Sequence, residues 1–247
     1  MNAAPDDGAA DVGVVAALHG EARCLMPLPA RLGARVRARG LSLYLSGVGP
    51  RRAQVAADAL LAAGAQGLMS WGTCGALAPQ LRAGDLILAS LVEGEDGQQW
   101  AADSPWRECL RAALPADAKP VSDGVLLSGE QVWTSPEQKA RGAERGVAVD
   151  MESAAIAACA MHAGVPFLVV RVVADGASRA LPPLALDAVD EIGCPRVRSF
   201  LRAAIRHPRD LRQLPALAQD FKCATRRLAR IAETGWAALA SAGGVAA

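Results

Sequence analysis

Residues 147–176 constrain the fold more than any other part of the chain, because they read as a strand, a helix and a strand in direct succession. A short apolar run ends at Val149, an alanine-rich segment follows, and a second apolar run extends from Phe167 to Val173. Gly164 and Pro166 are typical of a helix end. The β-branched content of the second run favours a buried strand. Two strands joined by a helix predict an α/β sheet.

Two carboxylates lie at the ends of these strands. Glu152 follows the first predicted strand, and Asp175 follows the second. In open α/β sheets, ligand sites lie outside the carboxyl ends of the strands. The pair therefore predicts a polar small-molecule site. The alternative is structural, with one charge at a helix N-terminus and one aspartate in a turn.

The remainder of the chain continues this alternation of strands and helices. Strands are predicted at 12–18, 67–71, 86–92 and 125–128, a hairpin around Gly40, helices at 51–63, 105–113 and 136–142, and turns at 19–23, 46–50 and 72–76. We therefore expect a three-layer α/β/α sandwich around a mixed, largely parallel central sheet. The expected divisions are a disordered N-terminus over 1–10, an α/β domain over 11–180, and a basic helical C-terminal extension over 181–247 that is packed on the domain or appended to it.

Charge is distributed unevenly along the chain. The net charge is +1, but residues 196–230 hold ten Lys or Arg and two Asp, a local +8, so the remainder carries −7. Helices are predicted at 195–206, 208–214 and 215–239. In the first, one face carries Val197, Phe200, Leu201, Ala204 and Ile205, with Arg198, Arg202 and Arg206 beside it.

This amphipathic pattern predicts peripheral contact of residues 195–230 with an anionic membrane or an acidic partner. The alternative is a helix that packs on the body of the protein and leaves its arginines in solvent. Nucleic acid is disfavoured as a partner, because no aromatic side chains are interleaved with the charge.

Composition argues against several classes of protein. The six cysteines form no C-x-x-C pair and the three histidines are not spaced for zinc, so no metal site is expected. A reducing cytosol is the simplest location. The first ten residues carry two Asp and no basic segment, unlike a signal peptide. No apolar run is long enough to span a bilayer. We expect a cytoplasmic protein, with contact at the inner membrane face as a further hypothesis.

Five short motifs between residues 12 and 180 match those of one enzyme superfamily in order and spacing. They are Val14-Val15-Ala16-Ala17-Leu18-His19-Gly20-Glu21, Ser46-Gly47-Val48-Gly49, Gly72-Thr73-Cys74-Gly75, Val149-Asp150-Met151-Glu152-Ser153-Ala154-Ala155 and Val170-Arg171-Val172-Val173-Ala174-Asp175. On these motifs the chain resembles the purine nucleoside phosphorylase and methylthioadenosine/S-adenosylhomocysteine nucleosidase superfamily. Within it, the chain is most similar to the hopanoid-associated phosphorylase branch, which is linked to removal of adenine from adenosylhopane.

The resemblance implies a role for each of the acidic residues. Glu152 would accept hydrogen bonds from the ribose hydroxyls, with Met151 beside the sugar. Asp175 would protonate, or hydrogen-bond, N7 of the leaving purine, and protonation needs a raised pKa. Glu21 corresponds to the residue that activates water in the nucleosidases. Val132 and Trp133 correspond to the segment beside the base, although Trp133 has a buried structural role as its alternative.

The nucleophile is ambiguous at the level of sequence. Gly72 and Thr73 resemble a phosphate-contacting turn of the phosphorylases, and Gly20 and Arg23 lie where that group places a phosphate loop and an arginine. Ser70, however, occupies a position where bacterial phosphorylases carry a second phosphate-binding Arg. Glu21 favours water and would repel phosphate. Arg171 could assist either nucleophile, or serve only in packing or an ion pair.

The main expectation is phosphorolysis of adenosylhopane in hopanoid biosynthesis, with inorganic phosphate as co-substrate and no cofactor. The first alternative is a hydrolytic nucleosidase that uses water. The second is a catalytically silent binding member of the fold. The expected partners are a purine nucleoside, which carries a lipid in the main interpretation, and further copies of the chain in a homo-oligomer.

Overall fold

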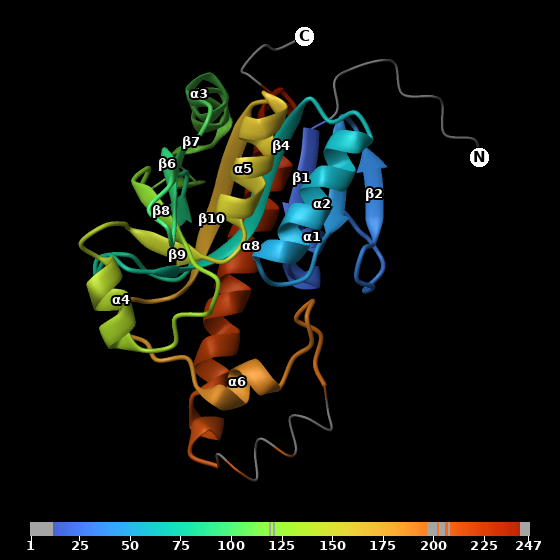
Figure 1. Cartoon of the computed structure of the whole chain (residues 1–247). Coiled ribbons are helices and arrows are strands. Elements are labelled where there is room, and N and C mark those ends of the chain that lie inside the picture. Colours follow the sequence, from blue (N-terminus) through green and yellow to red (C-terminus); the bar gives the residue numbers. More distant parts are fainter. Residues whose placement is uncertain are drawn as a thin grey trace.

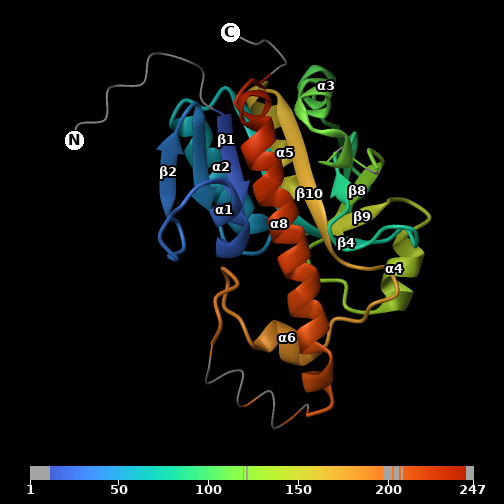
Figure 2. The same ribbon diagram turned by 180° about the vertical axis from the view of Figure 1, so that it is seen from behind.

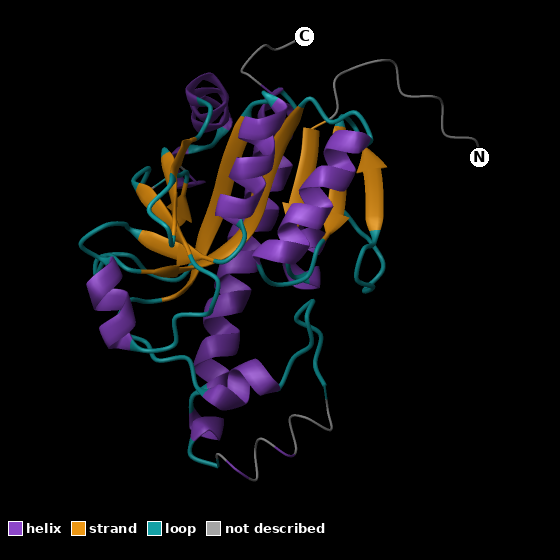
Figure 3. Ribbon diagram, viewed as in Figure 1, coloured by secondary structure: helices purple, strands orange, loops and turns teal. Residues whose placement is uncertain are grey.

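A ten-stranded mixed sheet forms the middle layer of the structure, with helices on both of its faces (Figure 1 and Figure 3). The structure is a computed structural model and describes residues 12–242 except 119, 121, 197–201, 203–205 and 207. The strands are β1 (Val12–Ala16), β2 (Arg35–Ala38), β3 (Leu41–Leu45), β4 (Gly67–Ala76), β5 (Leu86–Ile87), β6 (Leu91–Gly94), β7 (Gln99–Ala101), β8 (Val125–Ser128), β9 (Ala148–Asp150) and β10 (Phe167–Asp175). The helices are α1 (His19–Leu25), α2 (Pro50–Ala62), α3 (Ser104–Ala113), α4 (Pro136–Gly142), α5 (Ser153–Ala163), α6 (Pro183–Asp187) and α8 (Leu214–Leu239), with short 3₁₀ turns at Ala116–Ala118 and Asp210–Arg212.

Strand order places the ends of β1, β4, β9 and β10 close together. The main path runs β2-β3-β1-β4-β9-β8-β6-β7, while β10 pairs with β4 and β5 pairs with β10. Strand β1 is parallel to β3 and β4, and β10 is parallel to β4. The four antiparallel pairs are β2 with β3, β4 with β9, β5 with β10, and β6 with β7. The predicted mixed sheet in an α/β/α sandwich is thus confirmed.

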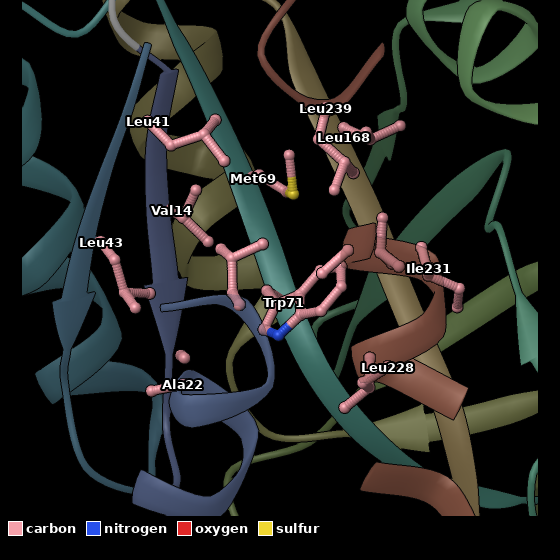
Figure 4. Close-up of a cluster of buried hydrophobic side chains, with 14 of the residues drawn as sticks. Val14, Ala22, Leu41, Leu43, Met69, Trp71, Leu168, Leu228, Ile231 and Leu239 are labelled. Atoms are coloured by element: carbon pink, nitrogen blue, oxygen red, sulfur yellow. The ribbon is translucent and has the colours of Figure 1, made fainter. Parts of the chain in front are cut away.

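The two faces of the sheet carry different helices. Helices α2 and α5 pack against each other on the face shown in Figure 1. Helices α1 and α8 lie together on the opposite face (Figure 2). Leu228 and Ile231 of α8 are fully buried and point toward Trp71 and Met69 of β4 (Figure 4). Helix α8 is therefore part of the main hydrophobic core.

Three local predictions are wrong, each because a distant segment decides the conformation. The glycine turn at 72–76 is part of β4, since β10 and β9 pair with it there. The turn at 19–23 is helix α1, and Gly20 packs against Phe221 of α8. The single strand at 86–92 is two strands, because β5 pairs with β10 whereas β6 pairs with β7 and β8.

The basic extension is described only in part. The apolar face predicted for 195–206, formed by Val197, Phe200, Leu201, Ala204 and Ile205, lies outside the described residues. Arg202 and Arg206 are exposed. Helix α8 contacts α1, α3 and β10. The division of the chain at residue 181 stays a prediction. Among the described residues, no helix combines the length and the apolar character needed to cross a membrane.

Candidate active site

A cleft with a cavity volume of about 240 Å³ opens at the carboxyl ends of the central strands. Its acidic wall is formed by four carboxylate side chains that come from three parts of the fold. These are Glu21 from α1, Asp150 and Glu152 around the end of β9, and Asp175 from the end of β10. The strand-end position predicted for Glu152 and Asp175 is therefore what the structure shows, and both side chains face the same cleft.

Glu21 is held by donors from two directions. Its Oε1 accepts hydrogen bonds from the backbone N–H of Thr73 at 2.8 Å and from the Thr73 hydroxyl at 2.7 Å. Its Oε2 accepts from the backbone N–H of Leu18 at 3.0 Å. Only 2% of Glu21 is exposed, and burial raises the pKa of its carboxyl group, with Arg171 and the Thr73 donors opposing that rise.

Gly72 gives Glu21 its space. A Cβ atom at Gly72 would lie 2.7 Å from Glu21 Oε2 and 2.7 Å from Arg171 Nη1. A glycine is needed here because two charged side chains meet directly over the backbone of β4.

Arg171 is the cation at the centre of the acidic wall. It is 2% exposed, and its Nη2 lies 2.7 Å from Asp150 Oδ2 and 3.5 Å from Glu152 Oε2. The same nitrogen donates to Ser70 Oγ at 2.7 Å, and Nη1 donates to the backbone carbonyl of Thr73 at 3.1 Å. Both terminal nitrogens of the guanidinium group therefore have partners within the protein, whereas the buried Nε has no hydrogen-bond partner among the described residues.

Glu152 lies at the start of α5. Its Oε1 accepts from the backbone N–H of Gly49 at 3.0 Å, and Gly49 adopts a φ of 106° that favours glycine. Burial raises the pKa of Glu152 to about 7, with Asp150 adding to the rise and Arg171 opposing it. Asp150 is fixed in turn, because its Oδ2 accepts a short hydrogen bond from the Ser153 hydroxyl.

Asp175 pairs with a lysine that comes from α4. Lys139 Nζ forms a short salt bridge with Asp175 Oδ2 and donates to the backbone carbonyls of Gly176 at 3.0 Å and Arg179 at 3.1 Å. Burial raises the pKa of Asp175, and Lys139 partly opposes the rise. A carboxyl group with a raised pKa suits a proton donor at neutral pH.

The loop between β8 and α4 forms part of the cleft wall. Gln131, Val132 and Trp133 line the cleft together with Met151. Trp133 also packs against the buried cluster formed by Leu77, Leu127 and Val149. A flat aromatic side chain at a cleft wall can stack on a purine base.

Most of the residues predicted for the site are brought together, and two are not. Glu21, Thr73, Val132, Trp133, Met151, Glu152, Arg171 and Asp175 all line the cleft, and Gly72 lies directly beneath Glu21 and Arg171. Gly20 and Arg23, the residues predicted to bind phosphate, do not line it. Gly20 packs on Phe221, and Arg23 is exposed on α1.

Sequence reasoning missed Asp150 and Lys139 as members of the site. Asp150 stands two residues before Glu152, so its place after a predicted strand was a usable signal. Lys139 had no such signal, because Glu137, Gln138 and Arg141 beside it read as an exposed polar helix.

Comparison with known proteins places the chain in a wider family. A family model described as the phosphorylase superfamily matches residues 34–206. The 5'-methylthioadenosine/S-adenosylhomocysteine nucleosidase of Maridesulfovibrio salexigens is 26% identical over 162 residues, covering 57% of this chain and 70% of the relative. The enzyme of the same name from Staphylococcus saprophyticus is 27% identical over 127 residues, covering 44% of this chain and 56% of the relative.

Solved structures share the fold over most of their length. The 5'-methylthioadenosine/S-adenosylhomocysteine nucleosidase of Helicobacter pylori, solved with butyl-thio-DADMe-Immucillin-A, matches with a TM-score of 0.65. The match covers 91% of this chain and 98% of that protein at 18% identity.

Proposed function

The chain belongs to the phosphorylase superfamily, and from this premise we propose that it hydrolyses the N-glycosidic bond of an adenosine-type nucleoside and releases adenine. The two relatives that match over part of their length are named as nucleosidases of 5'-methylthioadenosine and S-adenosylhomocysteine. Their names support an adenine nucleoside as substrate. The apolar residues Leu18, Val48 and Leu181 in the same cleft suit an apolar substituent at the 5′ position.

One observation carries the choice of water over phosphate: the two donors of Thr73, which are expected from the sequence to bind phosphate, already bind Glu21. Both the N–H and the hydroxyl of Thr73 donate to that carboxyl group. Among the described residues that line the cleft, Arg171 is the only cation, and it is paired with Asp150 and Glu152. A phosphate ion here would meet the carboxylate of Glu21 without an uncommitted cation to neutralise it.

In the proposed reaction, Glu21 takes a proton from water as the water oxygen bonds to C1′ of the ribose. The C1′–N9 bond breaks, and Asp175 gives a proton to N7, so adenine leaves as a neutral molecule. Glu152 accepts hydrogen bonds from the ribose hydroxyls and stabilises the positive charge that develops on the sugar. Water is consumed, and the products are adenine and a free reducing sugar.

Phosphorolysis of adenosylhopane was the main expectation from the sequence, and these observations favour the hydrolytic alternative over it. The lipid-linked substrate, the homo-oligomer and the membrane contact through 195–230 stay predictions. A silent binding member of the fold is disfavoured, because Glu21, Glu152 and Asp175 are all present and face one cleft.

Incubation of the purified protein with 5'-methylthioadenosine and with adenosine, in buffer with and without inorganic phosphate, tests the proposal. We expect adenine and a reducing sugar in both buffers at the same rate. Release that depends on phosphate and yields a sugar 1-phosphate would establish phosphorolysis instead, and adenosylhopane is the third substrate to include. Asp175→Asn is the matched variant, with an expected loss of about a hundredfold or more.

A further inference from the structure

Lys139 is a fully buried lysine to which the proposed reaction assigns no task. None of its surface is exposed, although it belongs to α4, a helix of seven residues at the edge of the molecule (Figure 1). Burial of an ammonium group is costly unless the group is paired and hydrogen-bonded. Its three donors meet three acceptors: Asp175 Oδ2 and the carbonyl oxygens of Gly176 and Arg179.

We propose that Lys139 is a positioning residue for Asp175, which fixes the orientation of that carboxyl group and sets how readily it gives up its proton. The inference rests on the proposed function, in which Asp175 protonates the leaving base. In this scheme Lys139 contacts the carboxyl group of Asp175 and does not touch the substrate.

The geometry provides the orientation. Lys139 engages Oδ2 of Asp175, whereas no hydrogen bond from any described residue reaches Oδ1. The two carbonyl contacts tie the ammonium group to the backbone that follows β10, so the ammonium cannot follow a rotation of the carboxyl group. Gly75 lies on the other side, where a Cβ atom would be 3.4 Å from both carboxyl oxygens. The carboxyl group is thereby held in one orientation with an oxygen available to the cleft.

Among the charged groups around Asp175, Lys139 has the largest effect on the pKa of the carboxyl group. Arg179, in the segment after β10, and Asp220 on α8 also influence the pKa of Asp175, but they form a salt bridge with each other at 3.1 Å and largely offset. Cys74 faces the same region from β4, and burial raises the pKa of its thiol, which keeps it neutral. Burial raises the pKa of Asp175 and Lys139 opposes this, so removal of the lysine charge should raise that pKa further.

The test is the pH profile of kcat/KM for adenine release by Lys139→Met, with Lys222→Met as a matched control at an exposed position of α8. If Asp175 must be protonated, the basic limb of the profile reports its pKa. We expect the limb of Lys139→Met to move to higher pH by about one unit or more, with kcat at neutral pH lowered about tenfold or more. Lys222→Met should reproduce the wild-type profile. A lower kcat with the limb unmoved would overturn the proposal.

A double-mutant cycle with Asp175→Asn separates this role from a general effect on folding. If Lys139 acts through Asp175, adding Lys139→Met to Asp175→Asn should change kcat/KM by less than about twofold. Losses that multiply would overturn the proposal. If Lys139→Met alone fails to fold while the double variant folds, the defect traces to the unpaired carboxylate and supports the pairing. If both variants fail to fold, Lys139 is a scaffold residue and the proposal is wrong.

Failure of the proposed function gives a different result. A wild-type protein that releases no adenine from any of the nucleosides removes the basis of both proposals. An active wild-type protein in which Asp175→Asn retains full activity rejects the assignment of the acid, and with it the role of Lys139. If the wild-type protein is active and Asp175→Asn is inactive, the proposed function stands. The pH profile of Lys139→Met then decides the role of Lys139 alone.

Discussion

Glu152 links the chemistry of the cleft to the stability of the protein. Burial raises the pKa of its carboxyl group from 4.5 to about 7. Between pH 4.5 and about pH 7, the carboxyl group of Glu152 is therefore protonated in the folded protein and ionised in the unfolded chain. Stability is consequently highest below pH 4.5 with respect to this group, falls as the pH rises toward 7, and is constant above it.

The variant Glu152→Gln should therefore remove part of the pH dependence of stability. At about 1.4 kcal/mol per pKa unit, the wild-type free energy of unfolding should lose about 3 kcal/mol more than that of the variant between pH 4.5 and pH 8. Urea unfolding of both proteins at the two pH values measures this difference, with Glu144→Gln as a control at an exposed position. Parallel pH dependence in wild type and Glu152→Gln would refute the burial argument.

Substitution of Gly72 tests whether adenine release requires Glu21 and Arg171 in their observed positions over β4. In Gly72→Ala, the new methyl group would meet Glu21 Oε2 and Arg171 Nη1 at 2.7 Å. One of the two must move, which breaks a hydrogen bond to Thr73. We expect nearly complete loss of adenine release and a loss of about 1–3 kcal/mol in the free energy of unfolding.

Gly176→Ala is the control for that substitution, because no atom lies within 4 Å of a Cβ atom at Gly176. It should keep both activity and stability near wild-type values. Thermal unfolding and the initial rate of adenine release are measured for both variants. Wild-type activity in Gly72→Ala would mean that Glu21 need not occupy its observed position.

Among the elements, those set by neighbouring residues could be predicted from sequence. The strand, helix and strand of 147–176 appear as β9, α5 and β10 within two residues of the predicted bounds, because Gly164 adopts a φ of 66° at the end of α5 and Pro166 follows. The hairpin around Gly40 is also confirmed, with β2 antiparallel to β3.

Elements that depend on distant partners could not be predicted. The glycines of 72–75 indicate a turn. In the structure these residues continue strand β4, because β10 pairs with them in parallel as far as Gly75. Lys139 looked like a solvent-exposed helix residue until Asp175, which lies 36 positions further along the chain, gave it a buried acceptor. Glu21, Glu152, Asp175 and Arg171 could thus be predicted from the sequence, whereas the pairing of Lys139 with Asp175 required the tertiary structure.

For the molecule as a whole, helix α8 combines a buried apolar side with exposed basic residues. Leu228, Ile231 and Leu239 of α8 are fully buried against the sheet (Figure 4). Lys222 and Arg226 on the same helix are exposed. The hypothesis of contact with an anionic membrane must therefore be tested by reversing exposed charges, such as Lys222→Glu with Arg226→Glu, and not by removing the extension.

Truncation at Gln213, which deletes α8, should prevent cooperative folding. Burial of a large apolar side chain stabilises a protein by about 1.5–3 kcal/mol, so loss of the three buried side chains named above would consume most of a typical stability of about 5–15 kcal/mol. The hydrogen bond from Trp106 Nε1 to the carbonyl oxygen of Ala238, at 2.8 Å, would also be lost. Far-UV circular dichroism and thermal unfolding check this, with a chain ending at Ala242 as the control that retains all of α8. A truncated protein that unfolds cooperatively at the wild-type temperature would show that the extension is an appendage and that the sheet folds without α8.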